Sequence, residues 1–394
     1  MSGKPLKVAV AGLGTVGAGV VTLLRQQADV ISERAGRAIV VTAVSAKDRK
    51  KDRGVDLSNL HWYDDAATMA AEADVDVVVE VIGGSSGIAK ATCEAAIAKG
   101  RHLVTANKAL LALSGTELAR AAEEKGVTLA FEAAVAGGIP IIKAVREGLA
   151  GNRFSSITGI LNGTCNYILT SMRETGREFA EVLAEAQALG YAEADPSFDI
   201  DGIDAAHKLS ILTSLAFGTA VDFAKMHIEG IRHVSALDIT FAEELGYRIK
   251  LLGIARRTEA GIEQRVHPCM VPIRSMIGRV DGVFNAVVAE GDFVGRTLFE
   301  GRGAGAGPTA SAVASDLIDI ATGRRGPAFG IRADRLTPLV AAPMADHKGA
   351  YYVRLMVLDQ AGVFADVAAA LRDADVSMEA VIQRGRAPGE TVPV

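Results

Sequence analysis

A glycine pattern near the N-terminus constrains the fold of this chain more than any other feature. Residues 6–11 (LKVAVA) form an apolar run, GLGTVG follows, and apolar residues continue over 20–24 at helical spacing. Strand, tight turn and helix in this order are typical of a βαβ unit whose turn holds the pyrophosphate of a dinucleotide. A glycine turn with a purely structural role is the alternative. The expected cofactor contacts are Gly12, Leu13, Gly14, Thr15, Val16 and Gly17.

The other apolar runs in the first third of the chain repeat this pattern. They are short, rich in β-branched residues and separated by alanine-rich helical stretches, two of which end at Gly100 and Gly126. Such alternation predicts an α/β fold with a Rossmann-type, doubly wound parallel sheet covered by helices on both faces. We assign residues 1–140 to a dinucleotide-binding domain that is completed by 305–330. The expected strands are 6–11, 38–44, 75–82, 102–105 and 127–131.

The pattern changes after residue 140. Because 394 residues exceed what one hydrophobic core comfortably serves, further domains are expected. We assign 141–304 to a mixed α/β domain for substrate binding and dimerisation, 324–335 to a linker and 350–394 to a small third domain. The expected elements of the second domain are a strand over 157–161, helices over 179–189 and 201–217, and weaker strands between 262 and 294.

Composition narrows the class of protein. A net charge of −5 argues against a nucleic-acid partner, because duplex binders usually carry a basic face. The three cysteines are far apart and have no zinc-site spacing, which fits a reducing cytoplasm. The apolar stretch 211–221 is shorter than the roughly 20 residues that cross a bilayer. We expect a cytoplasmic protein that acts on a small molecule, has no membrane partner and forms a homo-oligomer, either a dimer or a tetramer.

The residues after the second expected strand select between nicotinamide cofactors. NAD enzymes usually place an acid there for the ribose hydroxyls, whereas NADP enzymes place a cation for the 2′-phosphate. This strand ends in VSAK, no acid stands at its tip, and DRKK follows. We therefore expect NADP, bound in part by Lys47 and Arg49, with NAD as the alternative. A solvated basic loop without a ligand is the structural alternative.

Two stretches carry residues suited to hydride transfer to a carbonyl, which needs a proton donor and groups that hold the substrate. The first is TANK, from Thr105 to Lys108, at the end of an expected parallel strand. Ligands of open α/β sheets bind at that edge, so both residues are expected at the cofactor and Lys108 should point toward the nicotinamide. A surface lysine that caps a loop is the alternative.

The second stretch is an acidic segment, 190–208, that ends in Lys208. Asp204 and Lys208 are four residues apart, so on a helix they share one face and can form an ion pair. Lys208 leads into the apolar LSILTSLAF, and partial desolvation there would ease proton donation, although neighbouring carboxylates oppose that effect. Calcium ligands are an alternative for the acids, but their spacing does not match an EF-hand loop. A cationic amino group of the substrate suits them better.

Together these motifs resemble the homoserine dehydrogenase family. The segments GLGTVG, TANK, EAAVAGGIPII, LNGTCNYIL and LGYAEADPSFDIDGIDAAHKLSIL occur in the family's order, over roughly residues 5–330. The resemblance implies NAD(P)-dependent interconversion of L-aspartate 4-semialdehyde and L-homoserine in threonine and methionine biosynthesis. It implies Lys208 as proton donor and Lys108 as a second lysine that faces substrate and nicotinamide.

The same resemblance implies further ligand contacts. Substrate contacts are expected at Glu193, which would take the amino group, and at Asp199, Asp204, Gly163, Thr164 and Tyr191. Gly307 would touch the cofactor from the returning segment. A monovalent cation, sodium or potassium, would be held by Glu132 and by the carbonyl groups of Val135, Gly137 and Ile139.

The tail resembles part of an ACT regulatory domain. The expected elements are a strand over 351–359, an amphipathic helix over 363–374 and a strand over 376–384, so that the chain carries βαβ of a βαββαβ unit. The resemblance implies an amino-acid effector, typically threonine, at an interface between two copies. Because half of the sheet would be missing, we expect weak or absent inhibition by threonine, and a tail that is partly disordered or engaged in dimer contacts.

The sequence leaves three other interpretations open. A redox sensor that binds NAD(P) would explain the first domain but leave the acids and both lysines without a role. Another two-domain amino-acid dehydrogenase, such as those of the lysine pathway, is the second alternative. Thioester chemistry at Cys165 is the third, but no histidine stands near it in the sequence to activate the thiol.

Overall fold

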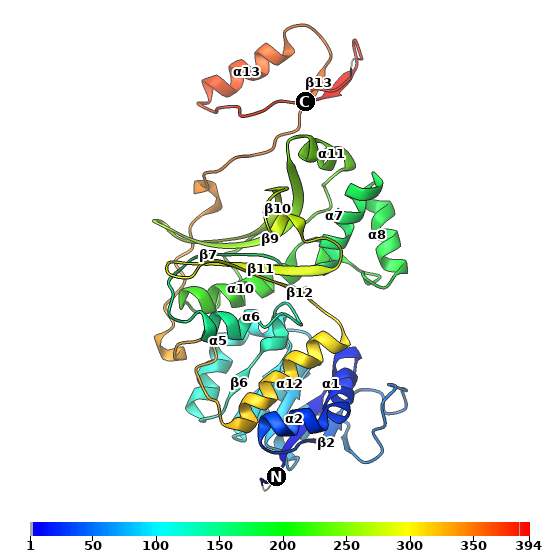
Figure 1. Cartoon of the computed structure of the whole chain (residues 1–394), viewed down its shortest axis with the longest axis vertical. Coiled ribbons are helices and arrows are strands. Elements are labelled where there is room, and N and C mark those ends of the chain that lie inside the picture. Colours follow the sequence, from blue (N-terminus) through cyan, green and yellow to red (C-terminus); the bar gives the residue numbers. More distant parts are fainter. Residues whose placement is uncertain (1–2, 386) are drawn as a thin grey trace.

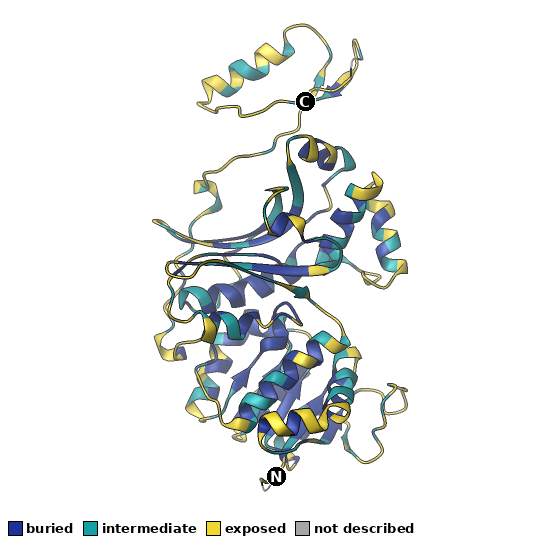
Figure 2. Ribbon diagram, in the orientation of Figure 1, coloured by how far each residue is buried: buried dark blue, intermediate teal, exposed yellow. Residues whose placement is uncertain are grey.

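The computed structural model describes residues 3–385 and 387–394 and arranges them as three layers of structure along one long axis (Figure 1). A six-stranded sheet lies at the N-terminal end, a second six-stranded sheet lies in the middle, and a small two-stranded sheet lies at the far end. Most of the strongly buried residues belong to the first two layers, whereas the third is largely exposed (Figure 2). No helix within the described residues combines the length and apolarity needed to span a membrane.

The first sheet confirms the predicted doubly wound arrangement. All its strands are parallel, in the order β3-β2-β1-β4-β5-β6. The short edge strand β3, which contains Trp62, was not predicted, because three residues carry no readable alternation. The strands are β1 Leu6–Ala11, β2 Ile39–Ser45, β3 His61–Tyr63, β4 Val77–Glu80, β5 His102–Thr105 and β6 Leu129–Ala130.

Helices cover both faces of this sheet because successive strand residues point to opposite sides. Val8 and Val10 pack with one group of helices, and Ala9 and Ala11 pack with the other. Helix α12 returns to the first sheet after the whole middle layer and packs beside α1 (Figure 1). One face carries α1 Thr15–Gln26, α2 Ala28–Ala35 and α12 Ala306–Thr322; the other carries α3 Ala66–Glu72, α4 Ile88–Ala98 and α5 Lys108–Glu124.

The second sheet has the order β12-β11-β7-β9-β10-β8 and is antiparallel except where β8 joins β10. Two of its long strands, β9 and β12, were missed. Lys250 and Arg256 interrupt the apolar alternation of β9, and Lys250 is nevertheless 1% exposed. The strands are β7 Phe154–Ile160, β8 His227–Ile228, β9 Tyr247–Thr258, β10 Gly261–Pro272, β11 Phe284–Gly291 and β12 Gly295–Arg302.

The helices of the middle layer position the side chains of the candidate active site. Helix α10 is buried along nearly its whole length and packs against both α5 of the first layer and strands of the second sheet. This contact brings the N-terminal end of α5 next to the first turns of α10. The helices are α6 Ile141–Lys143, α7 Gly163–Thr175, α8 Phe179–Ala188, α9 Ser197–Ile200, α10 Ile203–Phe217 and α11 Ala236–Glu244.

The tail differs from its prediction in the strands. Strand β13 covers Met356–Leu358, α13 covers Val363–Asp373, and β14 covers Thr391–Pro393, antiparallel to β13. The strand expected over 376–384 is wrong: its apolar residues are mostly exposed and pair with no strand among the described residues. Apolar alternation makes a strand only where another strand or a core receives it. The tail touches the middle layer at α11, where Tyr352 and Arg354 contact Asp238.

Candidate active site

The glycine turn after β1 has the geometry that close approach of a ligand requires. Gly12 has φ +97°, and a Cβ there would lie 2.7 Å from the Val81 carbonyl oxygen. A Cβ on Gly17 would lie 1.9 Å from the Gly12 carbonyl oxygen, so α1 packs on the turn only with glycine at that position. Gly14, the N-cap of α1, has open space where its Cβ would be, and Thr15 beside it is exposed. The fold of the turn thus requires glycine at Gly12 and Gly17, and Gly14 leaves open space at the start of α1, where the motif predicts a pyrophosphate.

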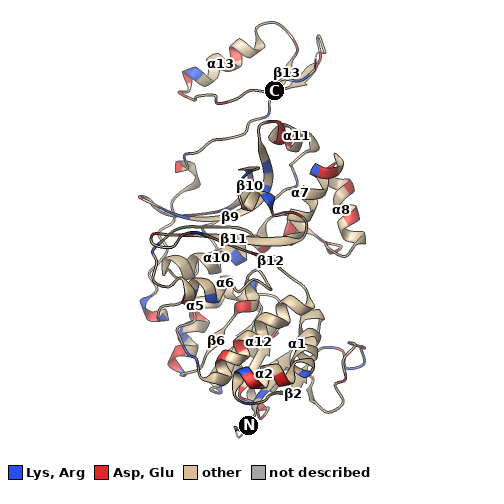
Figure 3. Ribbon diagram, viewed as in Figure 1, with Lys and Arg blue, Asp and Glu red and all other residues tan. Residues whose placement is uncertain are grey.

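The basic loop after β2 lies beside this turn (Figure 3). Lys47 and Arg49 are exposed, and the Arg49 guanidinium lies 5.8 Å from the centre of the Trp62 ring. Sequence reasoning missed Arg53, whose Nε donates to the Leu13 carbonyl at 3.1 Å and whose guanidinium lies 5.4 Å from the same ring. The position of Arg53 close to the basic residues 47–51 could have suggested a role at the cofactor. Its contact with the glycine turn, however, depends on how the loop folds back.

A pair of lysines and one aspartate form the centre of the candidate site. Lys208, on α10, donates from Nζ to Asp204 Oδ2 at 2.7 Å and to the Leu161 carbonyl at 2.8 Å. Lys108, the first residue of α5, has its Nζ 3.3 Å from the other oxygen, Asp204 Oδ1. Burial by itself raises the pKa of Asp204, but the two ammonium groups outweigh that effect and lower it to about 2. The predicted ion pair between Asp204 and Lys208 is confirmed, and the fold adds Lys108 to it.

An asparagine that the sequence analysis did not single out organises the acids. The Asn162 side-chain amide donates to Asp199 Oδ1 and to Asp204 Oδ2, both at 2.8 Å. Its oxygen accepts the backbone N–H of Cys165 and so caps α7. Burial, and next the charge of Asp204, raises the pKa of Asp199. The motif NGTCN could have predicted that Asn162 caps a helix. A capping role by itself does not indicate that the same side chain also contacts the acids.

The other residues expected at the substrate lie around this cluster and differ in how far they are buried. The Thr164 hydroxyl donates to the Tyr191 carbonyl at 2.7 Å and lies 3.3 Å from Asp199 Oδ2. A Cβ on Gly163 would lie 2.8 Å from the Val283 carbonyl oxygen, so the start of α7 lies close against the loop before β11. Glu193 is exposed on the turn before α9, and the structure records no contact of its carboxylate with either lysine.

Two residues expected at the cofactor have distinct surroundings. Thr105 is fully buried, and its hydroxyl donates to Glu80 Oε2 at 2.6 Å while it accepts the backbone N–H of Asn107. Its side chain therefore holds the strand ends together. Gly307 lies exposed in the first turn of α12, and a Cβ on Gly19 of α1 would lie 3.0 Å from the neighbouring Ala306 carbonyl oxygen. The start of α12 is thus beside the helix that follows the glycine turn.

The structure does not support a nucleophilic Cys165. Burial and the nearby carboxylates raise the pKa of its thiol well above the ordinary value. His207, next to Lys208 in the sequence, is buried between the rings of Phe198 and Phe223 and packs the helix.

Glu132 lies in the turn between the two large layers. Its two carboxylate oxygens accept the backbone N–H groups of Ile142 and Lys143, both at 2.9 Å. Burial, and next the charge of Asp316, raises the pKa of Glu132 to about 7. In the turn that follows, Gly137 has φ +46°.

Comparison with known proteins identifies the family. A model described as "Homoserine dehydrogenase, NAD binding domain" matches residues 12–132, and one described as "Homoserine dehydrogenase" matches residues 140–318. The homoserine dehydrogenase of Neisseria gonorrhoeae is 50% identical over 388 residues, which cover 97% of this chain and 89% of that protein. The chain belongs to the homoserine dehydrogenase family. It is an oxidoreductase that acts on a CH–OH group and interconverts L-homoserine and L-aspartate 4-semialdehyde with a nicotinamide cofactor.

Solved structures agree with this assignment. A homoserine dehydrogenase from Thiobacillus denitrificans superposes with a TM-score of 0.93 at 47% identity, over 99% of this chain and 91% of that one. A hyperthermophilic archaeal homoserine dehydrogenase in complex with NADPH superposes with a TM-score of 0.69 at 25% identity, over 82% of this chain and 100% of that one. The redox-sensor and lysine-pathway interpretations are therefore not needed.

Proposed function

We propose that Lys208 donates the proton that converts the aldehyde oxygen of the substrate into the hydroxyl of homoserine. The nicotinamide cofactor, when bound, supplies the hydride. The observation that carries the proposal is the pair of ammonium groups, buried Lys208 and half-buried Lys108, that share the buried carboxylate of Asp204. Two cations converge where the alkoxide's negative charge would develop, and preorganised cations in a water-poor site stabilise such charge strongly. Lys108, at the end of β5, would stabilise the same oxygen and orient the substrate.

The substrate's ammonium group is proposed to bind among the acids. Asp199 carries a carboxylate beside Thr164 and Asn162, and its raised pKa reflects an anion that lacks a full cationic partner. A bound ammonium group would supply that partner. Glu193, with Gly163 and Tyr191, is proposed to complete the site from the exposed side.

NADP is proposed as the preferred cofactor. Lys47 and Arg49 are exposed just after β2 and could meet a 2′-phosphate there, and no acid stands at the tip of the strand. Arg53 adds a third cation that already contacts the glycine turn. The NADPH complex of the archaeal relative is consistent with this preference.

A sodium or potassium ion is proposed at the turn between the layers. The described residues contain no group of three or more His, Cys, Asp or Glu side chains able to hold a metal ion, so such a site would rely on backbone carbonyls. Burial and the charge of Asp316 raise the pKa of Glu132 despite its two backbone hydrogen bonds, and a cation held by the carbonyls of Val135, Gly137 and Ile139 would favour the Glu132 anion. The Ile139 carbonyl already accepts the Ile141 N–H at 2.7 Å, which leaves one lone pair for a ligand.

We also propose a division of the chain into domains and an oligomeric state. The three layers correspond to a cofactor domain (1–140 with 305–330), a substrate and dimerisation domain (141–304) and a partial ACT-like tail (350–394). On the second sheet, the partly buried side chains of Ile254, Val288 and Leu298 lie against a small apolar cluster, which suits sheet packing against a second copy. We propose a cytoplasmic homo-oligomer.

Replacing Lys208 by methionine tests the proton donor. Methionine keeps the unbranched shape and removes the charge, so turnover should fall by roughly 10²–10⁴, the usual contribution of a general acid. Affinity for NADP, measured by fluorescence titration, should change little, because Lys208 lies on α10 and outside the glycine turn. Near-normal turnover of this variant would remove Lys208 from the mechanism.

A further inference from the structure

A second asparagine shares a carbonyl with the proposed proton donor. Asn285, on β11, is 1% exposed, and its Nδ2 donates to the Leu161 carbonyl at 3.0 Å. The same carbonyl accepts the Lys208 ammonium at 2.8 Å. Asn285 is therefore linked to Lys208 indirectly, because both side chains donate to the same backbone carbonyl just after β7.

The surroundings of Asn285 fix which way its amide points. A Cβ on Gly303 would lie 2.1 Å from Asn285 Nδ2, and one on Gly163 would lie 3.5 Å from Oδ1, so the amide is held between two backbone segments. Turning it over would put Oδ1 against the Leu161 oxygen, and two acceptors repel each other. In the orientation observed, Oδ1 is buried and has no hydrogen-bond partner among the described residues.

Stability alone does not explain an asparagine at this position. A buried acceptor without a partner costs free energy, and an apolar side chain of the same shape would remove that cost. The Leu161 carbonyl would still be satisfied, since Lys208 donates to it. Groups of this kind in native structures call for a functional explanation.

We propose that Asn285 is a positioning residue that fixes the Leu161 carbonyl and thereby aims the Lys208 ammonium at the substrate. Of the three protons on Lys208 Nζ, one goes to Asp204 and one to Leu161. With both acceptors fixed, the direction of the third proton is set. The inference rests on the proposed role of Lys208 as proton donor.

Substitution by leucine separates positioning from a structural role. Asn285→Leu should lower kcat about 10- to 100-fold, because small displacements of a catalytic group cost that much, while the KM for homoserine changes less than about threefold. The thermal midpoint should not fall. A kcat within about twofold of the wild-type value would overturn the inference, as would a loss confined to thermal stability. Asn285→Ala, which also lacks the donor, should give the same loss of kcat if leucine does not fit.

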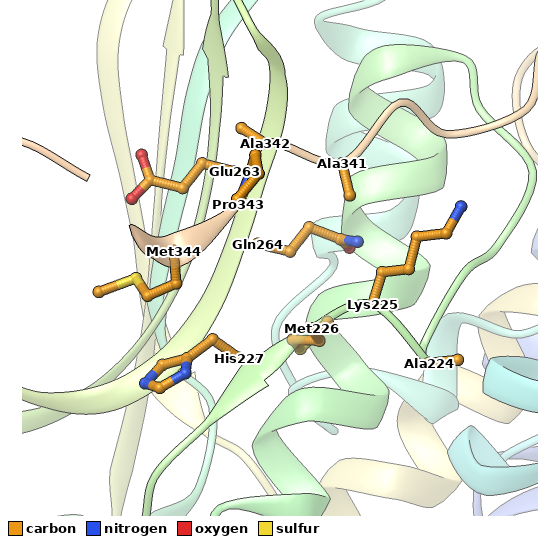
Figure 4. Close-up of a pocket in the computed structure, with 10 residues that line it drawn as sticks. All are labelled: Ala224, Lys225, Met226, His227, Glu263, Gln264, Ala341, Ala342, Pro343 and Met344. Carbon is orange, nitrogen blue, oxygen red and sulfur yellow. The ribbon is translucent and has the colours of Figure 1, made fainter. Parts of the chain in front are cut away.

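Gln264 on β10 offers a matched control. It is also a buried amide that donates one bond, to the Asp222 carbonyl at 3.2 Å, and its Oε1 has no partner among the described residues. It lines a cavity of about 310 Å³ between the loop before β8, β10 and residues 341–344 (Figure 4), and two strands separate β10 from β11 in the sheet. Gln264→Met should leave kcat within about twofold. An equal loss of kcat in both variants would show that removal of any buried amide suffices, against the inference.

A double variant links Asn285 to Lys208. If Asn285 acts only through Lys208, adding Asn285→Leu to Lys208→Met should change turnover less than about twofold. Losses that multiply would overturn the inference, because Asn285 would then act independently. Near-normal turnover of Lys208→Met alone would instead overturn the proposed proton donor, and the role of Asn285 with it. A severe loss in Lys208→Met with a normal Asn285→Leu enzyme would overturn the positioning role alone.

Discussion

Asp204→Asn removes the carboxylate that both site lysines share. Asparagine keeps the shape, but it leaves the ammonium groups of Lys208 and Lys108, now 2.7 Å and 3.3 Å from carboxylate oxygens, without an anionic partner. Lys208 is 8% exposed, so water cannot fully compensate. Both stability and turnover should therefore fall.

The size of the effect follows from the pKa of Asp204, which is lowered from 3.8 to about 2. Each pKa unit is worth about 1.4 kcal/mol, so the charged form stabilises the fold by about 2–3 kcal/mol. Breaking a buried ion pair usually costs about 3–5 kcal/mol, which makes the first figure a lower bound. Because the folded pKa lies below the unfolded one, this stabilisation is complete above about pH 4 and is lost as the pH falls through about 2.

Thermal melts and initial rates measure the outcome. At roughly 2–4 °C per kcal/mol, Asp204→Asn should lower the apparent Tm by at least about 5 °C at pH 7, and by the same amount at pH 5. Oxidation of homoserine should slow at least about 10²-fold. Asp201→Asn is the matched control: its partner Arg232 is 42% exposed in the side chain, so the loss should stay below about 1 kcal/mol. An Asp204→Asn enzyme with an unchanged Tm and a turnover within threefold would refute the shared ion pair.

Three further predictions concern the cofactor, the cation and the tail. Replacing Lys47 and Arg49 by glutamine should weaken NADP binding at least about tenfold and leave NAD almost unchanged; equal effects on both, measured by fluorescence titration, would make the loop a solvated surface. Sodium chloride, compared with choline chloride, should raise the Tm of the wild type most above pH 7, where Glu132 is ionised, and should not do so in Glu132→Gln. Threonine at millimolar concentration should inhibit weakly or not at all, because the tail forms only a two-stranded sheet within the described residues; strong inhibition below that level would contradict this.

Local signals in the sequence account for much of the cofactor layer. The three glycines of the turn, the parallel strands and the Asp204–Lys208 pair all depend on spacings of a few residues, and each occurs in the structure. Patterns with a period of two or about 3.6 residues reveal an element that buries one face, unless charged residues interrupt the pattern as in β9. The contact of Lys108 with Asp204, across 96 positions, was not predicted: the strand end placed Lys108 at the edge of the sheet, and the family resemblance placed both residues at the substrate.

The features that escaped prediction depend on contacts between distant segments. Asn162 and Asn285 look like ordinary polar residues in the sequence. Their roles are visible only in the fold, where Asn162 contacts two carboxylates and Asn285 contacts the Leu161 carbonyl. Strand β9 was not predicted, because Lys250 interrupts its apolar pattern. Lys250 can be buried there since it pairs with Asp281, 31 residues later, and no sequence pattern reveals that pairing. In the tail, the apolar residues of 376–384 predicted a strand, but no partner edge receives them among the described residues.

The specificity of the enzyme for homoserine is the most direct test of the whole account. Purified enzyme would be supplied with NADP⁺ and, separately, with L-homoserine, L-glutamate or meso-diaminopimelate, and NADPH formation followed by absorbance. We predict rapid turnover of homoserine, with the other two substrates at least about 10³-fold slower in kcat/KM, because the acids around Asp199 and the paired lysines fit one ammonium group and one reacting oxygen. Equal or faster turnover of glutamate or diaminopimelate would contradict it.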